Sequence, residues 1–156
     1  MRISKSSRHS KITGDLGEAL VLYWLSKHGF ECARVDHTGL DLIARNPRTR
    51  ELIGLSVKSR SRNPGTERSN VRIDLDDLAK VKAASKSFGC SPHFAIVVDA
   101  ADIIRVFILP LSRLLKLFPR RSSSIARGMT QRHLDSYYRD SDIKVFELRT
   151  ETRRWW

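Results

Sequence analysis

GLDLIARNPRTRELIGLSVK, residues 39–58, reads as two strands joined by a short turn. The first strand carries one acid, Asp41, inside the apolar run LDLIA, and the Asn46-Pro47 pair predicts the turn. Side chains alternate along a strand, so Ser56 and Lys58 share one face of the second strand. A hairpin brings Asp41 beside that face. An acid, a hydroxyl and a lysine so placed are typical of a site that holds a metal ion and a phosphate.

The chemistry of phosphodiester cleavage explains why these residue types matter. Mg²⁺ (or Mn²⁺) prefers carboxylate oxygens, and it polarises a phosphate and acidifies a bound water. A lysine beside the metal orients that water or stabilises the negative charge that develops on phosphorus. Two simpler interpretations stay open. Asp41 can accept hydrogen bonds from the amides of a turn at the start of its strand. Lys58 can lie on the solvent-exposed face of a half-buried strand.

A second acid, Glu18, lies in a helix predicted over residues 14–28. It shares a helical face with Val21, Leu22 and Leu25, which directs it toward the protein interior. The alternative is a capping box formed with Asp15 at the helix start, where acids are favoured in any case. Glu18 is therefore a candidate for the same site as Asp41, with the capping alternative open.

The net charge of the chain is +12 over 156 residues, with a pI of about 10.4. The basic residues cluster instead of being spread evenly, and a basic surface of this kind attracts polyanions, nucleic acid first. The alternative is a charged surface that only keeps the protein soluble, although solubility does not require charges of one sign. We expect a flexible basic arm over residues 1–11, one domain over 12–156 and a basic extension from about residue 110. The candidate nucleic-acid contacts are Arg8, Lys11, Arg60, Arg62, Arg120 and Arg121.

Several function classes are disfavoured by what the sequence lacks. Cys32 and Cys90 have no CxxC spacing, and the histidines have no paired spacing, so a zinc site is not expected. Two cysteines without such spacing favour a reducing, cytoplasmic setting. The N-terminus lacks the apolar core of a signal peptide, and the apolar run 106–118 is too short and too charged to span a bilayer. Trp155-Trp156 either stack on bases or pack on the domain.

The remaining pattern predicts an alternation of helices and strands. Strands are expected at 30–35, 93–98, 103–109 and 143–148, and helices at about 74–89 and 111–118. The strand at 93–98 is nearly all apolar, so it is expected at the centre of the sheet with both faces covered. Together with the 39–58 hairpin this order predicts an α/β fold with a mixed β-sheet flanked by helices.

Three short motifs in this order resemble the PD-(D/E)XK nuclease superfamily. They are Gly17-Glu18 on the first helix, Gly39-Leu40-Asp41 opening a strand and Ser56-Val57-Lys58 on the next strand. The segment 75–98 is similar to the archaeal Holliday-junction-resolvase branch. The resemblance covers about residues 12–109. It implies a restriction-endonuclease-like fold, cleavage of DNA, a Mg²⁺ ion held by Asp41 with help from Glu18 and the Val57 carbonyl, and pairing into homodimers.

One position departs from that superfamily, because Ser56 stands where its second carboxylate belongs. Either Glu18 or another acid compensates, or cleavage has been lost and binding kept. Three hypotheses follow: a metal-dependent DNA endonuclease of repair, recombination or defence, an inactive member that binds nucleic acid, and a small basic RNA- or ribosome-associated protein. The catalytic candidates are Asp41, Lys58, Glu18 and Ser56.

Overall fold

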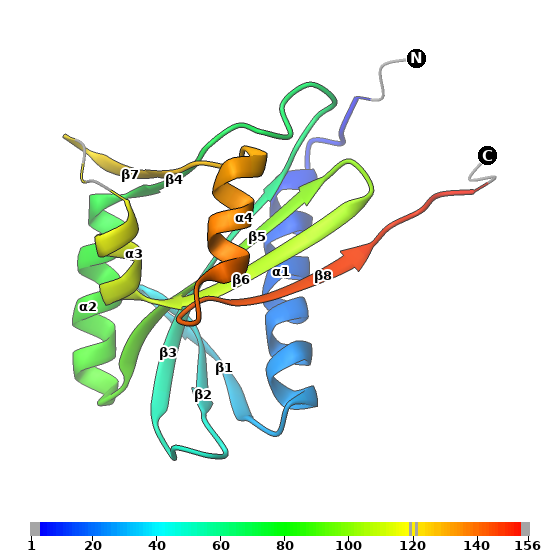
Figure 1. Ribbon diagram of the computed structural model, residues 1–156. Helices are drawn as coiled ribbons and strands as arrows, with labels where there is room; N and C mark the ends of the chain where they lie inside the picture. Colours follow the sequence, from blue (N-terminus) through cyan, green and yellow to red (C-terminus); the bar gives the residue numbers. More distant parts are fainter. Residues whose placement is uncertain (1–3, 119, 121, 154–156) are drawn as a thin grey trace.

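The computed structural model describes residues 4–153 except 119 and 121 (Figure 1). Its elements are α1 (His9–Lys27), β1 (Glu31–His37), β2 (Leu40–Arg45), β3 (Leu52–Ser61), β4 (Val71–Asp74), α2 (Leu75–Phe88), β5 (Ser91–Ala100), β6 (Ile103–Pro110), α3 (Leu111–Leu117), β7 (Ser124–Arg127), α4 (Gln131–Arg139) and β8 (Lys144–Arg149). None of these helices is long and apolar enough to cross a membrane.

The main sheet has six strands in the order β1-β2-β3-β5-β6-β8. Only β3 and β5 run parallel, and the other four pairings are antiparallel. The nearly all-apolar β5 lies between β3 and β6, as expected for a strand covered on both faces. The predicted mixed sheet flanked by helices is confirmed.

Helices cover both faces of this sheet. Val21 and Leu25 of α1 pack into one apolar cluster with Leu55 and Val97. The opposite cluster contains buried side chains of α2, α3 and α4, including Leu78, Leu114 and Leu134. Figure 1 shows the same division, with α1 behind the sheet and the other three helices in front of it. A small second sheet of β4 and β7 lies at the start of α2.

The central hairpin forms as its sequence predicts. The Asn46 side-chain oxygen accepts hydrogen bonds from the amides of Arg48 (2.9 Å) and Thr49 (3.2 Å), which closes the turn. Arg50 then adopts a φ of 63°, a left-handed conformation that reverses the chain into β3. The ladder pairs Leu42 with Leu55 and continues to the turn.

The structure differs from the sequence-based expectation in three respects: the start of α1, the role of Asp15 and three short elements that were not predicted. Helix α1 begins at His9, five residues before the predicted start, so residues 9–11 of the expected arm are helical. Asp15 is then in the body of α1, where it pairs with Lys11, and the capping-box interpretation of Glu18 is wrong. Strands β4 and β7 and helix α4 were not predicted, because each is only 4 to 9 residues long.

Candidate active site

The candidate site lies where β2 separates from β3. The β2–β3 ladder stops at Leu42 and Leu55, while β3 continues to Ser61 paired with β5 on its other side. We call the β3 segment 56–61, which has no ladder to β2, the open edge. Side chains from both faces of β3 can meet at an open edge, because no neighbouring strand separates them.

Asp41 accepts a hydrogen bond from the backbone of β3 at this edge. Its Oδ2 atom accepts a hydrogen bond from the Val57 amide over 2.5 Å, so the carboxylate occupies the place where the next backbone partner would be. The preceding turn fixes this position: Gly39 has a φ of 100°, and a side chain there would collide with the α2 backbone at Lys80. The start of β2 is therefore held against α2, with Asp41 at the open edge.

Glu18 approaches from α1. The helix packs closely on β3, because Gly17 has no side chain and the Ser59 hydroxyl fills the space that one would occupy. Burial raises the pKa of Glu18, and the negative charge of Asp41 raises it further, against a lowering influence of Arg34. Neither Glu18 nor Asp41 has an ion pair within 4.0 Å in the described part of the chain. Two neighbouring carboxylates without a cation repel each other, and a divalent cation would relieve that repulsion.

Lys58 was expected in one site with Asp41 and Glu18, but it lies on the face of β3 turned away from α1 and Glu18. Val57 packs into the α1-side cluster, and alternation therefore directs Ser56 and Lys58 toward α2. The Lys58 ammonium pairs with Asp77 of α2 over 2.8 Å, with exposed side-chain fractions of 22% and 30%. Ser56 is only 4% exposed.

The structure thus brings together Asp41, Glu18 and the Val57 amide, and places Lys58 beside Asp77. Across the described residues, no group of three or more His, Cys, Asp or Glu side chains is already arranged around a common metal position. The donor chemistry of Asp41 and Glu18 fits a hard cation, although the set holds only two carboxylates. A third acid, Asp77, was missed by the sequence-based selection. Its signal was its place on α2, one residue before the buried Leu78 and four before the buried Val81.

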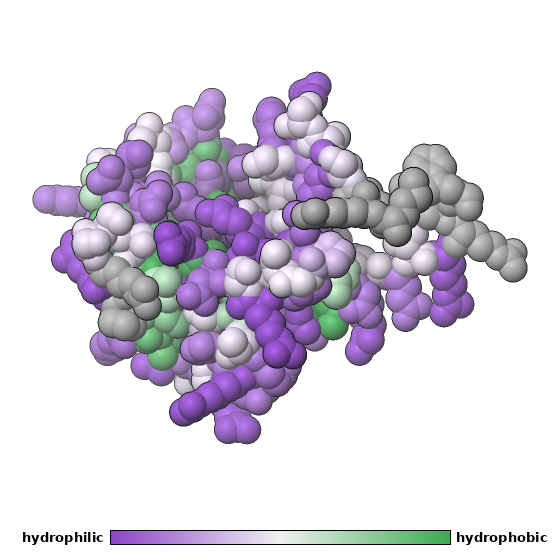
Figure 2. All heavy atoms as spheres, turned by 90° about the horizontal axis from the view of Figure 1, so that it is seen from above, coloured by the Kyte–Doolittle hydropathy of each residue, from purple (hydrophilic) through white to green (hydrophobic). Residues whose placement is uncertain are grey.

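Some of the predicted nucleic-acid contacts have exposed side chains, and others have side chains that already form contacts within the protein. Arg8, Lys11, Arg60 and Arg120 are exposed, although Lys11 also pairs with Asp15 over 3.3 Å. Arg62 is half-buried and donates to the Ser69 and Asn70 carbonyls, which holds the loop after β3. Figure 2 shows a largely hydrophilic surface at the end of the molecule where this loop lies. Arg121, Trp155 and Trp156 lie outside the described residues.

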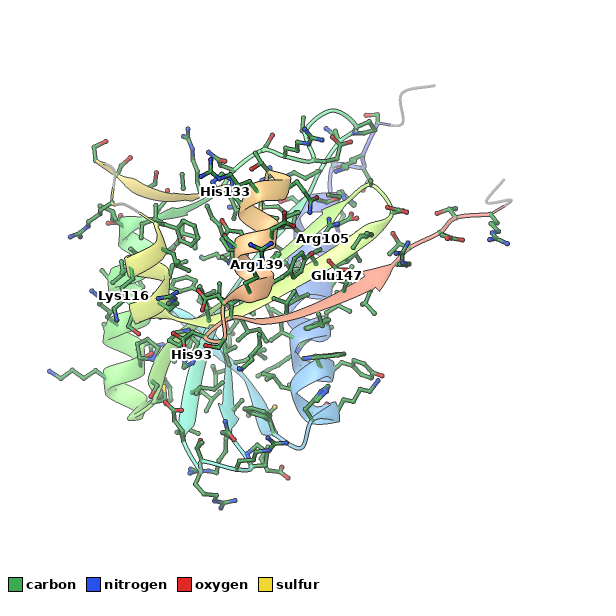
Figure 3. The ribbon with its side chains drawn as sticks, viewed as in Figure 1. His93, Arg105, Lys116, His133, Arg139 and Glu147 are labelled. Carbon is green, nitrogen blue, oxygen red and sulfur yellow. The ribbon has the colours of Figure 1, made fainter. Side chains whose placement is uncertain are left out.

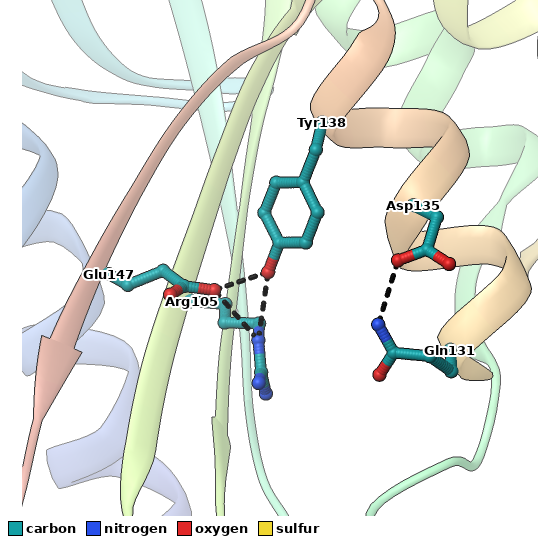
Figure 4. Close-up of polar contacts among 5 residues, drawn as sticks. All are labelled: Arg105, Gln131, Asp135, Tyr138 and Glu147. Carbon is teal, nitrogen blue, oxygen red and sulfur yellow. Dashed lines mark hydrogen bonds and ion pairs between the residues drawn. The ribbon is translucent and has the colours of Figure 1, made fainter.

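A separate group of polar side chains connects α4 with β6 and β8. Arg105 of β6 lies beside Glu147 of β8 (Figure 3). It donates to Tyr138 (3.2 Å) and to Glu147 (3.0 Å), and the Tyr138 hydroxyl donates to Glu147 (Figure 4). These contacts connect α4 to the edge of the sheet. A hollow of about 660 Å³ lies between the end of α1, the hairpin turn and β8, and Trp24, Pro47 and His93 contribute to its lining. Asp41, Glu18 and Lys58 do not line it.

Comparison with known proteins identifies the fold. No protein-family model matches the chain, and no curated protein matches it in sequence. A solved structure does match: Hjc, a Holliday junction resolvase from the archaeal hyperthermophile Archaeoglobus fulgidus. The two share 18% sequence identity over 69% of this chain and 84% of the resolvase, with a TM-score of 0.51. The predicted restriction-endonuclease-like fold is confirmed: the chain is similar in fold to this resolvase.

Proposed function

We propose that this chain is a metal-dependent endonuclease that cleaves phosphodiester bonds in DNA during repair, recombination or defence. The observation that carries the proposal is the proximity of the Asp41 and Glu18 carboxylates at the open edge of β3 in a resolvase-like fold, where neither has an ion pair within 4.0 Å among the described residues. The basic surface supplies the affinity for a polyanion.

In such a site, different residues of the chain would hold the metal ion and contact the phosphates. Asp41, fixed by the Val57 amide, and Glu18 would hold Mg²⁺ or Mn²⁺, with the Val57 carbonyl as a further candidate ligand. When bound, a hard divalent cation polarises the phosphate and acidifies a water molecule. Lys58 is a candidate cation on β3 to donate to a phosphate oxygen, and its side chain is still 22% exposed while paired with Asp77. The arm residue Arg8 and the β3 residue Arg60 would contact flanking phosphates.

A second function remains a candidate on one specific observation. Ser56 is a buried hydroxyl where the resembled superfamily carries an acid, and the described residues hold no group of three acids around a metal position. An inactive protein that keeps the fold and binds DNA would retain the basic surface and lose the chemistry. This alternative predicts DNA binding that is indifferent to the charge of Asp41.

The deciding experiment is a cleavage assay on branched, duplex and single-stranded DNA with Mg²⁺ or Mn²⁺. The wild type is expected to cleave at least one of them. Asp41→Asn, which keeps the side-chain shape and an acceptor for the Val57 amide, is expected to lower the rate by about a thousandfold or more. Asp36→Asn removes an exposed acid from β1 and serves as the matched control. Absence of cleavage on all substrates, with DNA binding intact, would favour the inactive binder.

The same samples test whether binding is electrostatic. With several phosphate contacts, the affinity of the wild type is expected to fall by about a thousandfold between low and moderate salt. Fluorescence anisotropy with a labelled junction and a labelled duplex measures it. A flat salt response would contradict the assignment of the basic residues to a DNA surface. Sedimentation of the free protein and of the complex determines whether the chain acts as a homodimer.

A further inference from the structure

We propose that Lys5 is a positioning residue of the nucleic-acid surface. It binds residues 4–8, which we call the arm segment, to the end of the open edge, and so holds Arg8 where it contacts a DNA phosphate. The inference rests on the proposed function, because it names a part of the chain that holds a DNA strand beside the candidate site. Figure 1 shows the arm segment entering α1 beside the loop that follows β3.

The contacts of Lys5 join segments that are 56 residues apart in the sequence. Its ammonium donates to the Ser61 carbonyl (2.8 Å), the Ser61 hydroxyl (2.9 Å) and the Arg62 carbonyl (3.1 Å). An ammonium group has three protons to donate, so these acceptors use its full capacity. While these hydrogen bonds hold, Lys5 has no proton left to donate to a phosphate oxygen.

The acceptors of Lys5 are themselves fixed by β5. The Ser61 hydroxyl donates to the Asp99 carboxylate over 2.7 Å, and the Arg62 amide donates to the Asp99 carbonyl over 2.8 Å. Ser61 and Asp99 also face each other in the parallel pairing of β3 with β5. The Asp99 carboxylate therefore lies behind the hydroxyl that meets the Lys5 ammonium, and the arm segment is bound to the two central strands of the sheet.

The position of Lys5 also sets the position of Arg8. The two residues are three positions apart, and between them the Ser6 carbonyl accepts a hydrogen bond from the His9 amide over 3.0 Å at the start of α1. The Arg8 side chain is exposed. The arm segment is thus held at one end by Lys5 and at the other by α1, with the Arg8 guanidinium available to a ligand.

The arm segment lies on the side of β3 that carries the candidate site. Val57 packs toward α1, and the alternation of side chains directs Ser61, four residues later, to the same face. Helix α1 covers this face and carries Glu18, whose pKa is influenced by the charge of Lys11. A DNA strand that reaches Glu18 along the first turns of α1 would therefore pass Lys11 and Arg8.

The alternative is that Lys5 only completes the end of β3 and has no part in binding. Lys5 remains exposed, and ordering a long exposed side chain costs conformational entropy. The contact also brings the arm segment close to Arg60 and Arg62 in a chain with a net charge of +12, which adds repulsion. A bound polyanion removes that repulsion, so a role in nucleic-acid binding accounts for the arrangement better than stability does.

The first test measures how firmly the arm segment is held in the free protein. Lys5→Met removes the donor, and Ser61→Ala removes one acceptor without changing the net charge. Each is expected to speed cleavage after Arg8 by an arginine-specific protease by about threefold to tenfold, followed by mass spectrometry. Lys82→Met, which removes an exposed lysine from α2, is the matched control. Lys5→Arg keeps several donors and is expected to restore protection, and thermal melting verifies that each variant is folded.

The second test measures DNA affinity by fluorescence anisotropy in a cycle of Lys5→Met and Arg8→Met. If Lys5 acts through the arm segment, each substitution lowers the affinity by about threefold to tenfold, and the double mutant binds no more weakly than the weaker single mutant. The dependence of log affinity on log salt then loses about one unit of slope in all three proteins. Ser61→Ala is expected to weaken DNA binding although it removes no charge.

Two results would overturn the proposal. One is multiplication of the two effects, with the double mutant losing about two units of salt slope, because Lys5 would then contact a phosphate itself. The other is cleavage after Arg8 that is no faster in Lys5→Met than in the wild type. The nuclease proposal fails separately, if the wild type cleaves no DNA while the affinities follow the expected cycle. A wild type that binds no DNA overturns both.

Discussion

The two sides of β3 handle their charges differently. Toward α1, Asp41 and Glu18 lie close enough for one charge to raise the pKa of the other carboxyl, without a cation within ion-pair distance among the described residues. Toward α2, Lys58 and Asp77 neutralise each other over 2.8 Å. On the α1 side, the repulsion between the two carboxylates can be relieved by a bound cation. On the α2 side, the opposite charges of Lys58 and Asp77 already neutralise each other without a ligand. For the proposed metal-dependent nuclease, this contrast favours the α1 side as the place where a cation would bind.

The sharpest test of this contrast is the protonation of Glu18. The pKa of this carboxyl is raised above its ordinary value by burial and by Asp41, so it binds a proton more tightly in the folded protein than in the unfolded chain. A protonated carboxyl cannot hold a cation, and Mn²⁺ affinity is therefore expected to rise with pH through the raised pKa. Glu18→Gln is expected to lower the affinity by about tenfold to a hundredfold and to flatten this part of the pH profile. Calorimetry across pH 4 to 8 measures both.

The metal-free protein gives an independent readout of Glu18. A carboxyl whose pKa is raised by folding favours the folded state at low pH, and this contribution is lost as pH rises from the ordinary pKa through the raised one. Glu18→Gln is therefore expected to be more stable than the wild type at neutral pH, with the difference vanishing at acidic pH. Urea denaturation at two pH values follows this. An Asp77→Asn variant that showed the same pattern would erase the contrast between the two sides.

Close packing of α1 on β3 is the second way to disturb only one side. Gly17→Ala would push a methyl group into the Ser59 hydroxyl, which is itself buried without a hydrogen-bond partner among residues 4–153 as described. The clash is expected to lower the free energy of unfolding by about 2 kcal/mol, partly offset by the better helix propensity of alanine. It would also move Glu18 away from Asp41 and leave Lys58 with Asp77.

A double mutant isolates that packing effect. Ser59→Ala alone is expected to be neutral or slightly stabilising, because it removes an unsatisfied buried hydroxyl. Combined with Gly17→Ala it is expected to recover most of the lost stability and the Mn²⁺ affinity. Thermal and urea unfolding of the four proteins completes the cycle. Strict additivity of the two substitutions would show that Gly17 and Ser59 do not set the distance between α1 and β3.

The sequence singled out candidate residues on both sides of β3, Asp41 and Glu18 toward α1 and Ser56 and Lys58 toward α2, but it missed Asp77 for a physical reason. Asp41 stood out because an acid in an apolar run has few acceptable environments, and the Val57 amide supplied one of them. Asp77 did not stand out, because acids are common in the first turn of any helix. Its pairing with Lys58 depends on how α2 packs on β3. That packing is set by contacts distant in sequence, such as Gly39 with Lys80 and Leu75 with Ser123.

The same distinction explains the missed C-terminal elements. Arg127 of β7 is fully buried, which no local pattern predicts for an arginine. Its guanidinium lies 3.9 Å from the Tyr137 ring centre and 4.3 Å from that of Phe107. Burial lowers its pKa to about 10, and the guanidinium has no hydrogen-bond partner in the described part of the chain. The residue joins β7 to α4, β6 and the end of α3 through the aromatic faces of Tyr137, Phe107 and Phe118, the last at 5.6 Å.

Substitution of Arg127 is the mildest test, and it acts on the α2 side. Met fills a similar volume and removes the charge that burial disfavours, so the loss of cation–π attraction is largely offset and the stability of Arg127→Met is expected to stay within about 1 kcal/mol of the wild type. Arg127→Lys keeps the charge but loses the flat guanidinium that stacks on Tyr137, and is expected to be the less stable variant. Urea denaturation ranks the two.

The functional consequence of the Arg127 substitutions is confined to one side of β3. β7 pairs with β4, and Ser123, the residue just before β7, accepts the hydrogen bond of the Leu75 amide at the start of α2, so the lysine variant is expected to loosen Asp77. Amide hydrogen exchange in the first turn of α2 would then accelerate, while exchange of the Val57 amide, held by Asp41 near α1, would not change. If exchange accelerated equally in the first turn of α2 and at the Val57 amide, the two sides of the site would unfold as one cooperative unit. The two sides would then differ in how their charges are paired and not in their local stability.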